Sequence, residues 1–169
     1  MREYVRSILL RELRTLRREI EAYESDAEIW KTPSGVANSA GALALHLSGN
    51  LRHFVGARLG GTGYVRDRPG EFAGGALPRE DILREIDAAI ADIDAALASL
   101  LDDELEARFP DAVAGVNVTT GDFLLHLIAH TGYHLGQIDY HRRLVTGSGE
   151  TVGAVAVPEL HSAESAGAR

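Results

Sequence analysis

Apolar residues recur along this chain at intervals of three and four, the spacing that places them on one face of an α-helix. The third of the periodic segments is the most regular, with an apolar residue at nearly every turn between Ile82 and Leu100. No alternating pattern long enough for a useful strand appears elsewhere. We therefore expect an all-α fold, a four-helix bundle. The predicted helices cover residues 4–23, 38–59, 78–100 and 119–147.

Capping signals support three of these helix starts. Asn38 or Ser39 can cap the second helix, because a short polar side chain accepts hydrogen bonds from the first free backbone N–H groups. Pro78 suits the first position of the third helix, where no N–H is needed. Thr119, with Asp122 three residues later, resembles a capping box for the fourth helix.

The connection between the second and third predicted helices, residues 60–77, is unusually long. Antiparallel neighbours need a turn of only about 2–8 residues. Roughly 18 residues, each spanning up to about 3.3 Å, can run the whole length of a 30 Å helix. We therefore expect a crossover that makes the second and third helices parallel. Residues 1–147 should form the bundle, and residues 148–169 a partly ordered C-terminal tail.

Composition narrows the chemistry further. The 169 residues suffice for one domain with its own core, and the net charge of −8 argues against binding nucleic acid, whose phosphates require a surplus of Lys and Arg. Cysteine is absent, so any metal must be held by nitrogen and oxygen. No apolar run is long enough for a signal peptide or a membrane span, and we expect a cytoplasmic protein without membrane contact.

Histidine is concentrated on the fourth predicted helix, with four of the seven between His126 and His141. His130 and His134 stand one turn apart on the apolar, inward face of that helix, where two imidazoles can bind one metal ion. A third ligand should come from another helix, and His46 is the best candidate. Three neutral imidazoles with a vacant fourth position are typical of a catalytic metal site.

The same spacing also suits histidines that are hydrogen-bonded in a core. His141 lies about 10 Å farther along the axis than the pair and cannot join the same ion. His126 could replace His134 in an alternative pair, or orient a ligand from outside. Asn50 shares the edge of its helix with the second-helix histidine. Gln137 could reach the ion's solvent or the substrate, or form a hydrogen bond between helices.

Two motifs resemble the DinB/YfiT superfamily of four-helix metalloenzymes. Residues 130–137, HTGYHLGQ, are similar to the H-x-x-x-H-R-G-Q element on the family's last helix, and residues 45–52, LHLSGNLR, to its second-helix histidine segment. The resemblance covers most of residues 1–147 and leaves the tail uncovered. One departure is Leu135, which stands where the family usually has arginine. If that arginine helps to bind a partner or substrate, this chain lacks it.

The resemblance implies that His46, His130 and His134 are the metal ligands, with zinc, nickel or iron as the divalent ion. It further implies an up-down-down-up bundle and a homodimer. The enzymes characterised in the family include thiol-dependent transferases and isomerases that use bacillithiol or mycothiol.

From these features we expect a metal-dependent transferase that adds a low-molecular-weight thiol to a small electrophile. The thiol must be a cosubstrate, because the chain has no cysteine. The alternatives are a metal-dependent hydrolase and a non-catalytic, metal-binding stress-response dimer. A hydrolase would need a carboxylate base beside the ion, and neither histidine segment supplies one, since Asp122 and Asp139 lie outside the inward face.

Overall fold

A computed structural model describes residues 1–73 and 75–166 of the chain, and this part is helical, with two isolated bridges in place of any strand. The four long helices are α1 (Arg2–Glu21), α3 (Ala40–Leu51), α5 (Arg79–Ser99) and α6 (Thr120–Thr146). Shorter elements are α2 (Asp26–Ile29), the π-helical η1 (Arg52–Ala57), α4 (Arg68–Phe72) and the 3₁₀ turns η2 (Asp102–Leu105) and η3 (Val157–Glu159). The predicted all-α bundle is confirmed.

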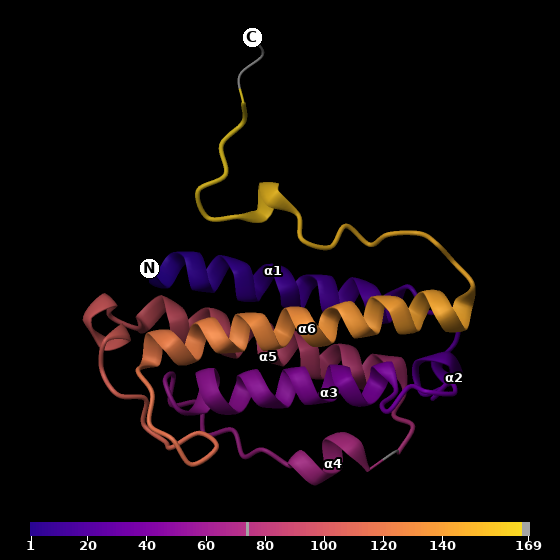
Figure 1. The fold of residues 1–169 in the computed structure, drawn as a ribbon, viewed down its shortest axis with the longest axis horizontal. Coiled ribbons are helices and arrows are strands. Elements are labelled where there is room, and N and C mark those ends of the chain that lie inside the picture. Colours follow the sequence, from indigo (N-terminus) through magenta and orange to yellow (C-terminus); the bar gives the residue numbers. More distant parts are fainter. Residues whose placement is uncertain (74, 167–169) are drawn as a thin grey trace.

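The helices follow the expected up-down-down-up order. α1 and α6 run in one direction and α3 and α5 in the other (Figure 1). α1 packs against α5 and α6, and α3 packs against the same two helices. Because the neighbours α3 and α5 are parallel, the chain between them must return along the bundle. The crossover, residues 58–78, does so and carries α4 on its way (Figure 1).

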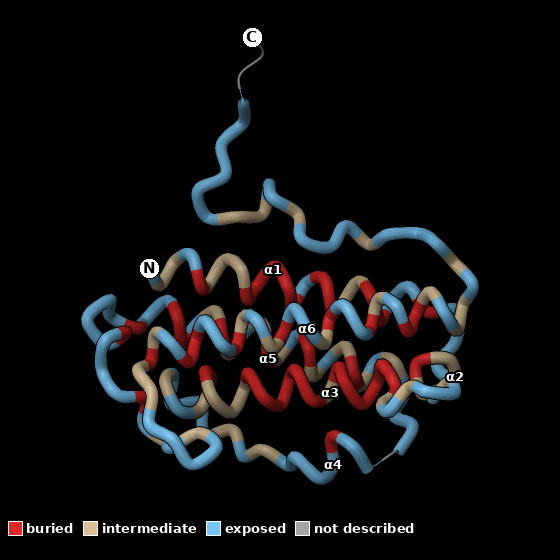
Figure 2. The backbone as a smooth tube through the Cα atoms, viewed as in Figure 1, coloured by how far each residue is buried: buried red, intermediate tan, exposed pale blue. Residues whose placement is uncertain are grey.

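The core consists of the apolar faces that the sequence pattern predicts. Buried positions gather on the inward sides of the four long helices, whereas most of the C-terminal tail is exposed (Figure 2). Full burial of each large aliphatic side chain stabilises the fold by about 1.5–3 kcal/mol. The fully buried aliphatic residues of α1 and α5 are Leu9, Leu13, Leu16, Ile20, Ile82, Ile86, Ile93 and Leu97.

Two helix starts form as the capping signals indicate. The Ser39 hydroxyl accepts the N–H of Ala42, and the Thr119 hydroxyl accepts the N–H of Asp122. At the far end of the second predicted helix, regular α-helix stops at Leu51, and the chain continues in the wider π-helical winding of η1. There the helix lies against α5, where Arg52 donates a 2.8 Å hydrogen bond to Asp92.

Buried polar contacts fix the end of α6. Arg142, which is only 1% exposed, donates from Nε to Glu19 on α1 at 2.5 Å. The Tyr23 hydroxyl lies 2.7 Å from Nδ1 of His141, whose Nε2 lies 2.9 Å from the carbonyl oxygen of Lys31. An Nε2–H that donates to that carbonyl leaves Nδ1 to accept from the hydroxyl. Burial lowers the pKa of His141, so the ring is held neutral within the core.

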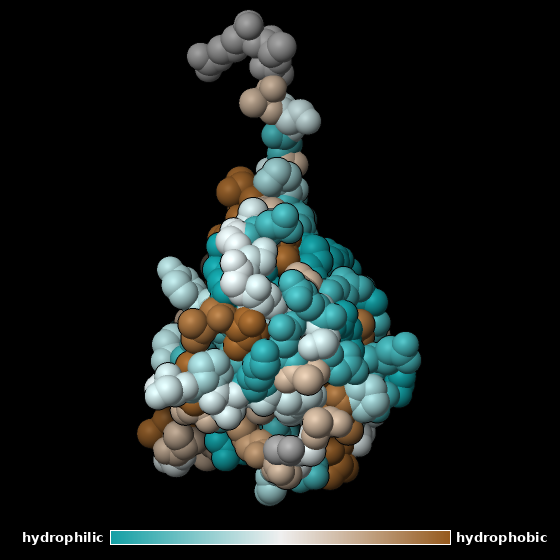
Figure 3. Space-filling view, turned by 90° about the vertical axis from the view of Figure 1, so that its right-hand side faces the viewer, coloured by the Kyte–Doolittle hydropathy of each residue, from teal (hydrophilic) through white to brown (hydrophobic). Residues whose placement is uncertain are grey.

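The segment after α6 turns back over α1 (Figure 1). Arg18 on α1 donates to the carbonyl oxygen of Val152, and the His161 ring meets Tyr4 edge-on. Seen from the end of the bundle that carries α2, this segment rises from a surface of mixed hydropathy (Figure 3). Of the predicted tail, residues 167–169 lie outside the described residues. No helix in the described part has the length and apolar character required to cross a membrane.

Candidate metal centre

Three histidines from two antiparallel helices meet at one point. His46 comes from α3, and His130 and His134 come from adjacent turns of α6. One ring nitrogen from each lies within 4.8 Å of the other two. The structure thus brings together the three residues that the sequence indicated as ligands. His46 is buried and the other two are half-buried.

The spacing of these nitrogens suits a metal ion. Nε2 of His46 and Nε2 of His130 are 3.3 Å apart. Two nitrogens bound to one tetrahedral zinc at about 2.0–2.1 Å are themselves about 3.3–3.4 Å apart. Nδ1 of His130 is buried and has no hydrogen-bond partner among the described residues. A donor set of three imidazole nitrogens therefore fits a divalent ion that prefers nitrogen, such as zinc, nickel or iron.

A buried carboxylate on the crossover orients the first of these rings. Oε2 of Glu71 lies 3.0 Å from Nδ1 of His46, and Arg66 donates to both Glu71 oxygens, at 2.6 and 2.8 Å. Nη2 of Arg66 also lies 3.1 Å from the same Nδ1, but it already donates to Glu71. A proton on Nδ1 of His46 that is donated to Glu71 leaves the lone pair of Nε2 facing the other histidines.

The carboxylate remains charged at neutral pH. Burial raises the pKa of Glu71, but the hydrogen bonds from Arg66 and His46 outweigh burial and leave that pKa below its ordinary value. Sequence reasoning missed Glu71 and Arg66, because they lie in a segment without periodicity. One signal was available in Gly49, a glycine in the interior of α3, where glycine is unfavourable. A Cβ at Gly49 would overlap Oε1 of Glu71, so a larger residue here would force the carboxylate to move from its place against α3.

The side chain of Gln137 orients a second ring. Its Oε1 lies 2.7 Å from Nδ1 of His134, one turn earlier on the same helix. A proton on that Nδ1 is therefore donated to Gln137, and Nε2 is left with its lone pair. Gln137 thus acts within α6, and the interhelical bond that was one expectation is not found in the described part of the chain.

Two other candidates lie beside the cluster. His126 is exposed and stacks on Phe123, with its ring centre 6.2 Å from that of His130, and it contributes no nitrogen to the three-histidine group. Asn50 is buried, and its Oδ1 has no hydrogen-bond partner in the described part of the chain. Leu135, at the position of the family's arginine, is buried in the core.

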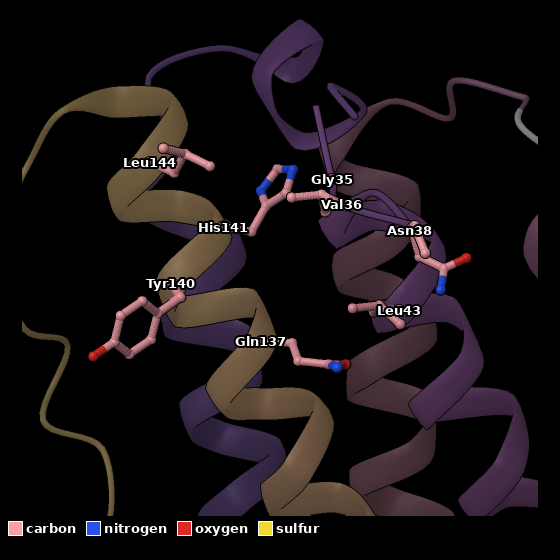
Figure 4. A pocket seen from close by; sticks show the side chains of 9 residues that line it. Gly35, Val36, Asn38, Leu43, Gln137, Tyr140, His141 and Leu144 are labelled. Atoms are coloured by element: carbon pink, nitrogen blue, oxygen red, sulfur yellow. The ribbon is translucent and has the colours of Figure 1, made fainter. Parts of the chain in front are cut away.

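The histidines line a cavity of about 580 Å³. The crossover supplies Arg66, Arg68 and Phe72 to its wall, and the connection before α6 supplies Val113 and Ala114. A second hollow of about 450 Å³ shares Asn38 and Leu43 with this cavity. In Figure 4, Gln137 extends from α6 toward these two residues, while Tyr140 points away from them.

The electrostatics of the cluster favour neutral imidazoles. Burial, together with repulsion from His134 and His46, lowers the pKa of His130 to about 4. Burial also lowers the pKa of His134, although the hydrogen bond that its Nδ1–H donates to Gln137 acts in the opposite direction. These two rings are therefore unprotonated at neutral pH, which is the form that binds a metal.

Comparison with known proteins gives one family. The family model described as the DinB superfamily matches residues 5–138, which include all three histidines and the crossover. No curated protein and no solved structure gives a significant match.

The lowered pKa of His130 predicts an acid-sensitive fold in the metal-free protein. The ring takes up its proton near its ordinary value of 6.5 in the unfolded chain, but only near 4 in the folded one. The stability present above pH 6.5 is therefore lost progressively as the pH falls toward 4. The free energy of unfolding is measured by urea denaturation at several pH values with chelator present. In His130→Asn it should depend less on pH between 6.5 and 4. His161→Asn, at an exposed histidine, should not, and equal profiles for the two variants would contradict the assignment.

Proposed function

Because the chain belongs to the DinB superfamily, we propose that it is a metal-dependent enzyme whose divalent ion is held by His46, His130 and His134. The observation that carries this proposal is the convergence of three imidazole nitrogens beside a cavity, with the outer nitrogens of two rings committed to Glu71 and Gln137. A purely structural metal site is closed and needs no adjoining cavity. The cavity therefore favours an enzyme over a non-catalytic metal-binding dimer.

We propose that the reaction is the transfer of a low-molecular-weight thiol to a small electrophile. When bound, a divalent ion with an open position lowers the pKa of a thiol or a water that joins it. The chain contains no cysteine, so the thiol must enter as a cosubstrate. Imidazole ligands leave the charge of the ion uncompensated, and this favours a thiolate beside it.

A hydrolase is less well supported by the same site. Hydrolysis at a metal usually uses a carboxylate as general base, and Glu71 is the carboxylate that contacts the histidine cluster. Both of its oxygens are bonded to Arg66 or His46, and its pKa is lowered. Glu71 therefore holds His46 in place and is poorly suited to removing a proton from water.

The first prediction of this proposal concerns metal content. The protein, purified without an affinity tag, should carry or take up one divalent ion per chain, measured by elemental analysis after loading with zinc or nickel. His130→Ala should abolish uptake. Glu71→Gln should weaken affinity about 10–100-fold in a chelator competition, because the partner of His46 loses its charge.

The matched control for metal uptake is His126→Ala, an exposed histidine on the same helix, which should retain the ion. Loss of metal in this variant, together with retention in His134→Ala, would mean that the wrong pair has been assigned. Failure of the unmodified protein to take up zinc or nickel would end the proposal.

The reaction itself is tested with a bimane-type electrophile and a panel of cellular thiols. The metal-loaded protein should consume at least one thiol faster than the uncatalysed reaction, and His130→Ala should reduce the rate to background. The absence of metal-dependent consumption with every thiol would refute the transferase. Metal-dependent ester hydrolysis in a parallel assay would favour the hydrolase instead.

We also propose that the chain forms a homodimer through the outer face of α6. This face exposes Tyr133 and Tyr140 and contains Gly132 and Gly136, where an added Cβ would meet no atom within 4 Å. No other segment of the described chain therefore packs closely enough against α6 to require glycine at these two positions. Residues 123–138 include no Asp, Glu, Lys or Arg, so two copies with a net charge of −8 can meet here without direct charge repulsion.

Light scattering at tens of micromolar should give twice the mass of the chain. Gly136→Arg should shift the protein toward the monomer, because it places a charge at the centre of the face. Arg84→Glu, an exposed charge reversal on α5, should leave the mass unchanged. A monomeric unmodified protein would exclude the dimer.

A further inference from the structure

The cavity beside the histidines carries positive charge, although the chain as a whole has a net charge of −8. Two arginines, Arg66 and Arg68, lie in its wall. Glu71 cancels the charge of Arg66 through a two-point contact. Arg68 makes no ion pair or side-chain hydrogen bond within residues 1–73 and 75–166, and the carboxylate of neighbouring Asp67 accepts the N–H of Gly70. One exposed guanidinium without an ion-pair partner in the described residues therefore borders the cavity.

An aromatic ring places this charge near the proposed metal ligands. Cζ of Arg68 lies 5.7 Å from the centre of the Phe72 ring, within the range of a cation–π contact. The Phe72 ring in turn lies 5.0 Å from that of His46. One intervening ring therefore separates the guanidinium from the histidine cluster, and a small molecule in the cavity can touch both.

A second polar group on the cavity wall has no partner. Asn50 is only 8% exposed and lies on α3 one turn beyond His46. Its Oδ1 is fully buried and accepts no hydrogen bond from the described residues, so the amide nitrogen is the polar atom that this side chain can offer to the cavity. No hydrogen bond of this amide nitrogen is found in the described part of the chain, so a ligand that accepts its N–H would gain a hydrogen bond without displacing a protein partner.

From these contacts we infer that the cavity binds the carboxylate of an organic substrate, with Arg68 and Asn50 as its donors. A planar guanidinium matches the geometry of a carboxylate, and an amide N–H adds a second donor. One unpaired guanidinium matches a monoanion better than a doubly charged phosphate. Phe54 and Phe72 line the cavity between these donors and the histidines, so the part of the ligand that carries the carboxylate should be apolar. This assignment deepens the proposed function by naming the anchoring group of the electrophile.

The experiment compares phenylacetate with phenylacetamide, which has nearly the same shape and no charge. Binding to the full-length protein is measured by NMR titration in the presence of a chelator, so the result depends on neither metal nor catalysis. Phenylacetate should bind about tenfold more tightly, the effect of one charge-assisted hydrogen bond. Arg68→Gln should remove this preference, whereas Arg84→Gln, an exposed arginine outside the cavity, should keep it.

Asn50→Ala tests the amide, with circular dichroism to verify that the variant folds, and it should weaken the binding of phenylacetate. Equal affinity of the unmodified protein for both compounds, or an unchanged preference in Arg68→Gln, would overturn the inference. A preference for phenylacetate that appears only after zinc is added, and that survives in Arg68→Gln, would also overturn the inference. The carboxylate would then bind the metal and not the arginine. Tighter binding of phenylphosphonate would overturn the choice of a carboxylate. A protein that takes up no metal but keeps the preference would refute the proposed function alone.

Discussion

The hydrogen bond between His46 and Glu71 joins the two parts of the molecule on which the site depends, the helical bundle and the crossover. A carboxylate buried without partners costs several kcal/mol, so Glu71 is stable at this place only while His46 and Arg66 both bind it. The same contact fixes the proton of His46 on Nδ1 and the direction of its ring. Gly49 makes it possible by leaving room for the carboxylate against α3. The contacts among His46, Glu71 and Arg66 thus determine how the crossover packs, how the His46 ring is oriented and which charges lie beside the cavity.

The connectivity of the bundle explains why a loop can take part in this way. Because α3 and α5 are parallel neighbours, the chain must travel back along the bundle between them, and α4, on this passage, lies against α3. The same passage brings Arg68 and Phe72 to the cavity that the histidines line. A simple up-down-up-down bundle with short turns would have no long connection passing along α3, and that side of the cavity would be left unlined.

The sequence predicts the helices and the grouping of three histidines because both depend on a period that can be counted along the chain. His130 and His134 share a face by spacing alone, and His46 lies on the adjoining face of a second amphipathic helix. Glu71 and Arg66 could not be found in this way, because their positions are set by contacts between segments and by no local repeat. The role of His126 also required the structure. Its offset of about 40° from His130 is small on a helical wheel, yet it turns the ring outward.

The histidines and the other residues of the cavity wall come from different kinds of segment, and this has an evolutionary consequence. The three histidines sit on long helices of the bundle, whereas Arg68 and Phe72 sit on a connection that is attached to α3 through Arg66 and Glu71. Surface connections tolerate substitution and insertion far better than the helices they join. Descendants of one such bundle can therefore diversify in the lining of the cavity through changes confined to a single segment, while the three-histidine cluster is inherited intact.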